Sequence, residues 1–179
     1  MTGAVIVMGV SGSGKSTLGR ALAEALGWQF VDGDALHPPG NIAKMAAGVP
    51  LDDQDRRPFL ERVAKAIAEH RRSGVVVACS ALRRSYRDLI RERAGEVTMV
   101  LPLLDREVLK ARLAQRNGHF MPPALLDSQL DLLQFPGADE QAILVDGNDP
   151  TPRQVEHVLA AVRAERAVAD GSEARVDRR

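Results

Sequence analysis

A glycine-rich segment near the N-terminus has the residue types and the spacing that bind a phosphate chain. It matches the pattern G-x-x-x-x-G-K-[ST] and reads Gly9, Val10, Ser11, Gly12, Ser13, Gly14, Lys15, Ser16 and Thr17. Its glycines permit backbone angles at which successive N–H groups point at phosphate oxygens, and a helix that begins there adds its positive end. We expect Lys15 to reach the β- and γ-phosphates and the Ser16 hydroxyl to bind Mg²⁺. The segment predicts a site for a nucleoside triphosphate with magnesium.

Two carboxylates follow the next apolar run along the chain. Asp32 and Asp34 are two residues apart, which places them on one side of a continuing strand. Phosphoryl transfer needs a carboxylate that orients the acceptor hydroxyl and takes its proton late in the reaction. We assign Asp34 to this role and Asp32 to magnesium, directly or through a water. The alternative is a turn in which these side chains only cap a helix.

The nucleotide motif alone does not separate a switch, a motor and a kinase. A GTPase would also carry D-x-x-G after a strand and N-K-x-D, and neither pattern occurs. A motor ATPase has an acidic residue at the end of the strand beside the glycine-rich segment. The run at residues 75–79 ends in Cys79 and Ser80, without a carboxylate. These features favour a small-molecule kinase.

Several cationic and polar residues are candidates for binding a small acid with hydroxyl groups. Cationic side chains pair with a carboxylate, and short polar side chains bond to hydroxyls. The candidates are His37, Lys44, Arg56, Arg57, Ser80 and Arg84. Each has a structural alternative: His37 caps or packs, the cations face water, and Ser80 is a helix N-cap that can also serve the site. Arg83, Arg84 and Arg87 cannot all point inward from one helix.

These residues must be positioned by an alternation of short apolar runs and longer helical patterns. The runs at residues 4–8, 75–79 and 97–103 are mostly continuous, as in strands buried on both faces of a parallel sheet; shorter ones lie at 29–31 and 142–145. Helices are expected from about residue 15, at 58–72, around 82–90, from a cap at Asp105, and from a capping box at residues 151–154. Because cations at a helix N-terminus oppose its dipole, a helix that starts at Pro58 favours a functional role for the preceding arginines. The pattern is that of a doubly wound α/β protein.

Composition excludes several other classes. The chain has 179 residues, with 24 basic and 24 acidic side chains and a net charge of zero, which argues against a nucleic-acid or membrane partner. Its single cysteine, Cys79, excludes an intramolecular disulfide and a cysteine-rich zinc site. No apolar run approaches the roughly 20 residues that span a bilayer, and no signal peptide is evident, so a cytoplasmic protein is expected. We expect one domain over residues 1–169 and a disordered tail over residues 170–179.

Six blocks of the sequence resemble the bacterial gluconokinase family. The match covers about residues 5–145, and D-G-D-x-x-H-P and C-S-A-L-[RK] are specific to that family among small P-loop kinases. The blocks are D-G-D-A-L-H-P at residues 32–38, N-I-A-K-M at 41–45, G-V-P-L-D-D-Q-D-R-R-P at 48–58, C-S-A-L-R-R-S-Y-R-D at 79–88, G-H-F at 118–120 and P-G-A-D-E at 136–140. The resemblance implies ATP-dependent phosphorylation of D-gluconate on its 6-hydroxyl, giving 6-phosphogluconate for the pentose phosphate and Entner–Doudoroff routes. It also implies a shikimate- or adenylate-kinase-like fold with a five-stranded parallel sheet and a lid, often in a homodimer.

Further residues follow from the likeness to shikimate-kinase-like folds. Arg112 and Arg116 are four residues apart on one expected helix face. We assign Arg116 to the transferring phosphoryl group and Arg112 to the adenine or the phosphates; the alternative is two solvated arginines. The lid is expected at about residues 117–137 and the acceptor-binding segment at about 34–57. His119 either contacts substrate or stays in the lid, and residues 146–150 flank the base or form a turn.

Two alternative functions remain open from the sequence. One is a kinase of the same architecture that acts on another small hydroxy acid, such as shikimate. The other is a regulatory nucleotide-binding module without catalysis. The paired carboxylates beside an Arg/Lys/His set argue against the module, because a sensor needs no acceptor site.

Overall fold

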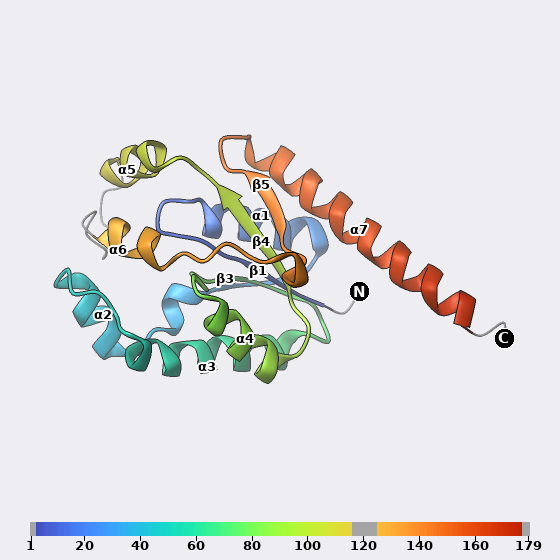
Figure 1. Ribbon diagram of the computed structural model, residues 1–179, viewed down its shortest axis with the longest axis horizontal. Helices are drawn as coiled ribbons and strands as arrows, with labels where there is room; N and C mark the ends of the chain where they lie inside the picture. The colour runs from blue at the N-terminus through green and yellow to red at the C-terminus, as the bar shows by residue number, and fades with distance from the viewer. Residues whose placement is uncertain (1–2, 116–124, 177–179) are drawn as a thin grey trace.

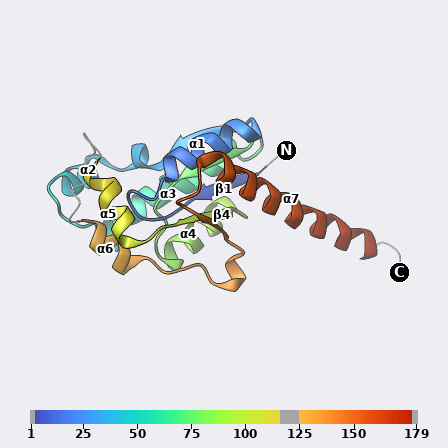
Figure 2. The same cartoon turned by 90° about the horizontal axis from the view of Figure 1, so that it is seen from above.

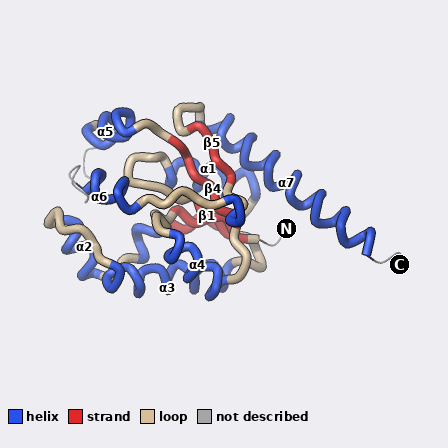
Figure 3. Tube along the Cα trace, viewed as in Figure 1, coloured by secondary structure: helices blue, strands red, loops and turns tan. Residues whose placement is uncertain are grey.

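The computed structural model describes residues 3–115 and 125–176, with the backbone alone at residue 125 and residues 165–176. Its centre is a sheet of five strands in the order β2-β3-β1-β4-β5, and every neighbouring pair is parallel. Figure 3 shows the strands as an inner layer with helices around them. The strands are β1 (Ala4–Val7), β2 (Gln29–Asp32), β3 (Val75–Ala78), β4 (Thr98–Leu103) and β5 (Ile143–Asp146). The predicted parallel α/β sheet is confirmed.

Burial of the strands follows their place in the sheet. All residues of β1 and β3 are buried, as their unbroken apolar sequences predict. The edge strands differ: β2 is partly exposed throughout, and β5 alternates between buried and exposed residues, with Leu144 turned outward. The strand that enters the glycine-rich loop, β1, is thus buried along its whole length.

Helices cover both faces of the sheet. Helices α1 (Lys15–Leu26) and α7 (Thr151–Val176) pack on one face through a core that includes Leu18, Leu22 and Val158. Helices α3 (Asp53–His70) and α4 (Arg84–Ala94) pack on the other, around Phe59 and Ile90. Figure 2 shows α1 and α7 on the opposite side of β1 and β4 from α4. The two apolar faces of the sheet are thus both removed from water.

Three shorter helices gather at one end of the molecule. They are α2 (Pro39–Ala46), α5 (Arg106–Ala114) and α6 (Leu125–Leu132), and Figure 1 shows them beyond the end of the sheet to which the β4 arrow points. A small apolar cluster of Val10, Leu82, Leu109, Leu113 and Leu126 ties the glycine-rich loop to α5 and α6. Loops and helices at the carboxyl edge of the strands therefore form one packed unit.

The start of α3 differs from the sequence-based expectation. The helix begins at Asp53, five residues before Pro58, and Asp52 and Asp55 form a capping box with their reciprocal side-chain and backbone bonds. The capping box satisfies two backbone N–H groups and so starts the helix, although Pro58 then lies inside it and lacks the N–H for one i→i−4 hydrogen bond. Arg56 therefore lies beyond the first turn, so the dipole argument for the two arginines was wrong.

Other helix boundaries were also predicted incorrectly. Ser80 does not cap α4, whose N-cap is Arg83; the intervening turn contains Ala81 at a φ of 41°. Thr151 is the first residue of α7 rather than its cap, and the Gln154 side chain bonds to the Asp149 carbonyl. Helix α7 also continues to Val176, through part of the segment at residues 170–179 for which we expected a disordered tail.

A buried ion pair joins α4 to the segment that follows α6. Arg87 is completely buried, and its Nε and Nη2 atoms donate to the two Glu140 carboxylate oxygens at 2.5 and 2.7 Å. Its Nη1 donates to the carbonyls of Ala81, Leu82 and Gln134. These hydrogen bonds from Arg87 are the main cause that lowers the pKa of Glu140 to about 2. One guanidinium thus fixes the turn after β3 and the end of the α6 segment together.

Replacing Arg87 by Met is expected to lower the free energy of unfolding by about 3–5 kcal/mol, because the buried Glu140 carboxylate would lose its two shortest charged hydrogen bonds and keep only the longer one from Arg91 at 3.2 Å. Urea unfolding near neutral pH measures the loss. The loss should shrink as the pH falls from 4.5 towards about 2, where the wild-type Glu140 is itself protonated.

Arg93→Met is the matched control on the same helix. Arg93 is half-exposed, and its ion pair with Glu61 spans 3.8 Å. Its replacement should change stability by no more than about 0.5 kcal/mol. Equal losses of unfolding free energy in the two variants would show that the buried ion pair stabilises the fold no more than the exposed one.

Candidate active site

The glycine-rich loop, residues 9–16, connects β1 to α1 in an open curve. Gly9, Gly12 and Gly14 have φ angles of 130°, 83° and 91°, which side chains rarely adopt. Gly14 is the N-cap of α1, and no side chain caps the helix. The first N–H groups of α1 are therefore presented at the end of the sheet, as an anion-binding loop requires.

Two hydrogen bonds involve the residues of the glycine-rich loop. The Lys15 ammonium donates to the Val10 carbonyl across the loop at 2.9 Å. The Ser11 N–H donates to Oε1 of Gln129 on α6 at 2.7 Å, in a buried contact. Gln129 was missed by sequence reasoning, because nothing in its local pattern distinguishes it from the outer face of a short helix. A side chain from the expected lid thus lies against the glycine-rich loop.

The two predicted carboxylates have different surroundings. Asp32 is the N-cap of a short 3₁₀ helix, η1 (Gly33–Leu36), and its side chain accepts a hydrogen bond from the Asp34 N–H at 3.2 Å. Asp34 itself faces a pocket. Gly33 separates them because a Cβ there would lie 2.2 Å from the Ala78 carbonyl oxygen, closer than any atom can approach. Asp32 therefore caps η1, as the alternative predicts for it, and Asp34 lines the pocket as its predicted role requires.

One pocket brings the glycine-rich loop together with the acceptor-side residues. It opens where β1, β2 and β3 end, and α3 and α6 form its walls. Its lining contains the predicted residues Ser11, Lys15, Asp34, His37, Arg56 and Ser80, together with Met45, Pro50, Leu51, Phe59, Leu82, Ser128 and Gln129. The lysine of the glycine-rich loop and the Asp34 carboxylate thus share one cavity with an arginine and a histidine.

His37 is buried in the wall of this pocket. Its ring stacks on Phe59 with centroids 3.7 Å apart and planes 7° from parallel. Burial lowers the pKa of His37 to about 4, and this effect outweighs the opposite influence of nearby Asp34. His37 is therefore a neutral hydrogen-bonding group at physiological pH rather than a cation.

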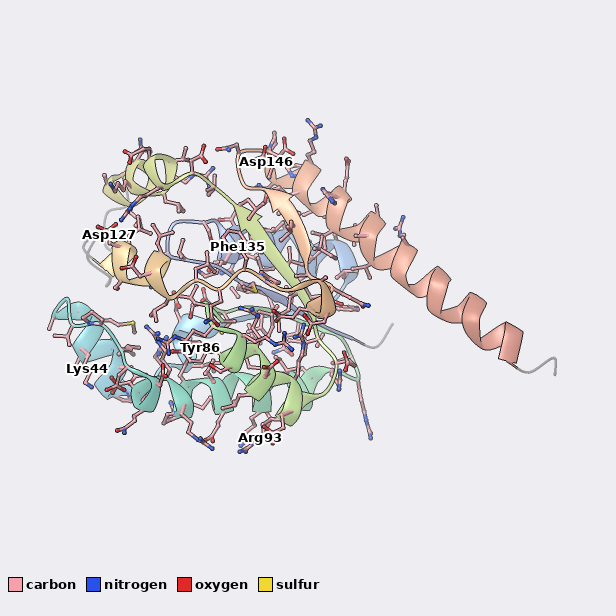
Figure 4. The ribbon with its side chains drawn as sticks, in the orientation of Figure 1. Lys44, Tyr86, Arg93, Asp127, Phe135 and Asp146 are labelled. Atoms are coloured by element: carbon pink, nitrogen blue, oxygen red, sulfur yellow. The ribbon has the colours of Figure 1, made fainter. Side chains whose placement is uncertain are left out.

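Arg56 is held in the pocket by Tyr86, a residue of the family block at 79–88 to which sequence reasoning gave no role. Its Nη1 donates to the Tyr86 hydroxyl at 3.3 Å, and the hydroxyl in turn donates to Asp53. Tyr86 belongs to α4 and is labelled beside that helix in Figure 4. Partial burial raises the pKa of Tyr86, so it stays protonated and able to donate. The chain Asp53–Tyr86–Arg56 fixes the guanidinium by hydrogen bonds.

Three predicted substrate residues lie outside the pocket. Arg57 pairs with Glu61 and is 65% exposed; Lys44 pairs with Asp55 at 2.7 Å, at the periphery of the molecule in Figure 4. Arg84 pairs with Asp88 and with Asp139 at 2.8 Å in each case. None of the three lines the pocket, because each side chain is part of an exposed ion pair, so their predicted role in substrate binding stays a prediction. Their exposure in this structure agrees with the solvated alternative for Lys44, Arg57 and Arg84.

Arg112 lies between the glycine-rich loop and the turn after β5. Its Nη2 donates to the Gly147 carbonyl at 2.8 Å, and its Nη1 is 3.9 Å from the Cβ position that Gly14 leaves empty. Asp146, labelled in Figure 4, accepts a hydrogen bond from the Asn148 N–H within that turn. This position suits contact with a nucleotide. The predicted residues Arg116 and His119 lie outside the described residues.

Comparison with known proteins agrees with this geometry. A family model described as an AAA domain matches residues 5–136. The gluconokinase of Gluconobacter oxydans (strain 621H) is 44% identical over 163 residues, which are 90% of this chain and 92% of that protein. The thermosensitive gluconokinase of Escherichia coli (strain K12) is also 44% identical, over 89% of this chain and 87% of that protein.

Solved structures extend the likeness to three dimensions. The crystal structure of a gluconokinase from Sinorhizobium meliloti 1021 has a TM-score of 0.84 and 44% identity, covering 96% of this chain and 98% of that one. A shikimate kinase from Aquifex aeolicus has a TM-score of 0.62 at 20% identity over 90% of this chain and 97% of that one, and shows the shared fold alone. The glycine-rich loop is the phosphate-binding loop of a P-loop kinase, and the chain belongs to the gluconokinase family.

Proposed function

We propose that the protein transfers the γ-phosphoryl group of ATP to the 6-hydroxyl of D-gluconate and releases 6-phospho-D-gluconate and ADP. One observation carries the proposal: the pocket that holds Lys15 also holds Asp34 and Arg56. The relatives named gluconokinase support the choice of substrate.

Arg56 is the group we assign to the gluconate carboxylate. A guanidinium presents a planar set of donors that matches a carboxylate, and Tyr86 already fixes one edge of it. His37 and Ser80 line the same pocket and supply short polar groups for the hydroxyls of the sugar acid. This arrangement orients the far end of gluconate towards Asp34 and the glycine-rich loop.

Transfer then needs charge neutralisation and one proton acceptor. The Lys15 ammonium and the loop N–H groups stabilise the phosphate oxygens while the gluconate oxygen attacks the γ-phosphorus in line with the breaking bond to ADP. Asp34 orients the attacking hydroxyl and accepts its proton late in the step, then returns the proton to solvent. Arg112 is proposed to contact the nucleotide from the side of Gly147.

Magnesium fits the oxygen donors that the chain offers. Within residues 3–115 and 125–176 no group of three or more His, Cys, Asp or Glu side chains could form a metal cage. Mg²⁺ seldom uses such a cage, since it takes most of its ligands from phosphates and water. We propose the Ser16 hydroxyl as its protein ligand, with Asp32 beyond a water. The ion supplies neutralisation of charge on the β- and γ-phosphates.

The remaining assignments extend the proposal beyond the described residues. Arg116 is proposed to stabilise the transferring phosphoryl group, and residues 117–137, which carry His119, to act as a lid that excludes water. A homodimer in the cytoplasm, without nucleic acid or membrane partners, completes the proposal. Among the described residues no helix is long and apolar enough to cross a membrane.

A substrate panel tests the proposal directly. ADP release with Mg-ATP is measured in a coupled assay against gluconate, other sugar acids, shikimate and AMP. We expect turnover that depends on gluconate, with phosphate found on its 6-oxygen by NMR. Turnover with shikimate alone would favour the other hydroxy-acid kinase, and the absence of turnover with every acceptor tested would favour the nucleotide-binding module.

Asp34→Asn is expected to lower kcat by about 10²–10⁴-fold, because the amide cannot accept the hydroxyl proton. Circular dichroism should show an unchanged fold. The matched control is Asp88→Asn, which removes an exposed carboxylate that pairs with Arg84 outside the pocket. A kcat for Asp34→Asn within twofold of the control would reject the assigned role.

Arg56→Met and Arg57→Met form a neighbouring pair that tests the carboxylate site. Losing Arg56 should raise the KM for gluconate by about 10–100-fold, the usual effect of one charged hydrogen-bond partner. The KM for ATP should stay within about threefold of wild type. Arg57 is exposed and pairs with Glu61, so its variant should match wild type in steady-state kinetics.

A further inference from the structure

We propose that Asn41 is a positioning residue that fixes which ring nitrogen of His37 carries the proton, so that His37 offers an N–H donor to gluconate. The inference rests on the proposed function, because it concerns the same pocket. It adds a role for Asn41 on α2, which contacts His37 from behind.

The orientation of the Asn41 side-chain amide is set by a backbone carbonyl. Asn41 is 5% exposed, and its Nδ2 donates to the carbonyl oxygen of Asp55 at 2.8 Å. A carbonyl accepts hydrogen bonds and cannot donate them, so the NH₂ group, not the amide oxygen, must face Asp55. This contact removes the usual ambiguity between the two ends of an asparagine amide.

The second hydrogen of the same NH₂ group points to His37. Nδ2 of Asn41 lies 3.3 Å from Nδ1 of His37. Because Nδ2 is a donor, Nδ1 must be the acceptor and carries no proton. In a neutral imidazole the proton then belongs to Nε2. The stack on Phe59 holds the ring in its plane and so preserves this pairing.

The protonated nitrogen faces the pocket. The hydrogen bond found for the His37 ring among the described residues is the one at Nδ1. Nε2 is not among the fully buried side-chain atoms that lack a partner in this part of the chain, so it keeps some contact with solvent. His37 lines the pocket, which is the solvent region that its ring reaches. Nε2–H is therefore available to an oxygen atom of the substrate.

Charged groups around His37 leave the ring neutral. Burial is the largest influence on the pKa of His37, Asp34 opposes it, and Arg56 reinforces it. Lys15 lines the same pocket. From the α2–α3 side, the Asp55 carboxylate is already paired with the Lys44 ammonium at 2.7 Å. A donor that does not titrate near neutral pH can bind hydroxyl or carboxylate oxygens with constant strength.

Asn41→Asp tests the proposal through the pH dependence of KM for gluconate. The new carboxylate would accept a hydrogen bond from Nδ1–H of His37 and would raise the pKa of His37 towards the neutral range. At about pH 5 the imidazolium keeps its Nε2–H, and the KM should be close to that of wild type. At about pH 8 the neutral ring keeps its proton on Nδ1 and offers an acceptor at Nε2, so the KM should rise about tenfold.

Controls separate this effect from a merely structural one. The KM of the wild-type protein for gluconate is measured over the same pH range. Its change with pH is subtracted from the change found for Asn41→Asp. Asn41→Asp in a His37→Gln background should lose the added pH dependence, because glutamine places an N–H near the Nε2 position and does not titrate. Asn41→Asp that turns over gluconate with the wild-type pH profile would overturn the inference and leave the proposed function intact. No turnover of gluconate by wild type would instead refute the proposed function.

The tautomer can also be observed in the wild-type protein, so the test does not depend on a variant that folds. Nitrogen-15 NMR distinguishes a protonated from an unprotonated imidazole nitrogen, and His37→Gln identifies the signals of His37. We expect Nε2 protonated and Nδ1 unprotonated near neutral pH. A protonated Nδ1 with an unprotonated Nε2 would contradict the role of Asn41.

Discussion

The burial of β1 between two parallel neighbours is the constraint on which the site depends. β1 is hydrogen-bonded to β3 on one side and to β4 on the other, and all its residues are buried. Parallel strands end at the same edge of a sheet, so the loops after β1, β2 and β3 meet there. The glycine-rich loop, Asp34 and Ser80 are thereby brought into one pocket without any direct sequence link. Figure 1 shows α2 and α6 at this end as well.

The acceptor side of the pocket depends on contacts between helices rather than on the sheet. α3 carries Arg56 and Phe59, and α4 supplies the Tyr86 hydroxyl that holds Arg56. Arg87 fixes α4 to the turn after β3 and to Glu140 with hydrogen bonds that are wholly buried. Such bonds act over short distances, so the pocket geometry depends on the register of α3 against α4.

Much of the fold was predictable, because its signals are local. Unbroken apolar runs indicated the central strands, and the glycines with Lys15 indicated the loop between β1 and α1. The errors lie at helix boundaries. The Asp52–Asp55 capping box starts α3 earlier than Pro58, and Arg57 turns outward although its neighbour Arg56 turns inward. A residue type that suits an anion does not show which side of a helix it occupies.

The sequence by itself determined the class of chemistry: a phosphate-binding loop, a carboxylate two residues beyond the end of a strand, and enough family pattern to name gluconate as acceptor. Those features depend on local backbone geometry and residue type. Only the tertiary structure decided which side chains share the pocket. It separated Asp34 from the capping residue Asp32, placed Gln129 on the loop, and put Asn41 behind His37. The reason is physical: hydrogen bonds and burial join residues far apart in the chain, and their partners are fixed only when the helices pack on the sheet.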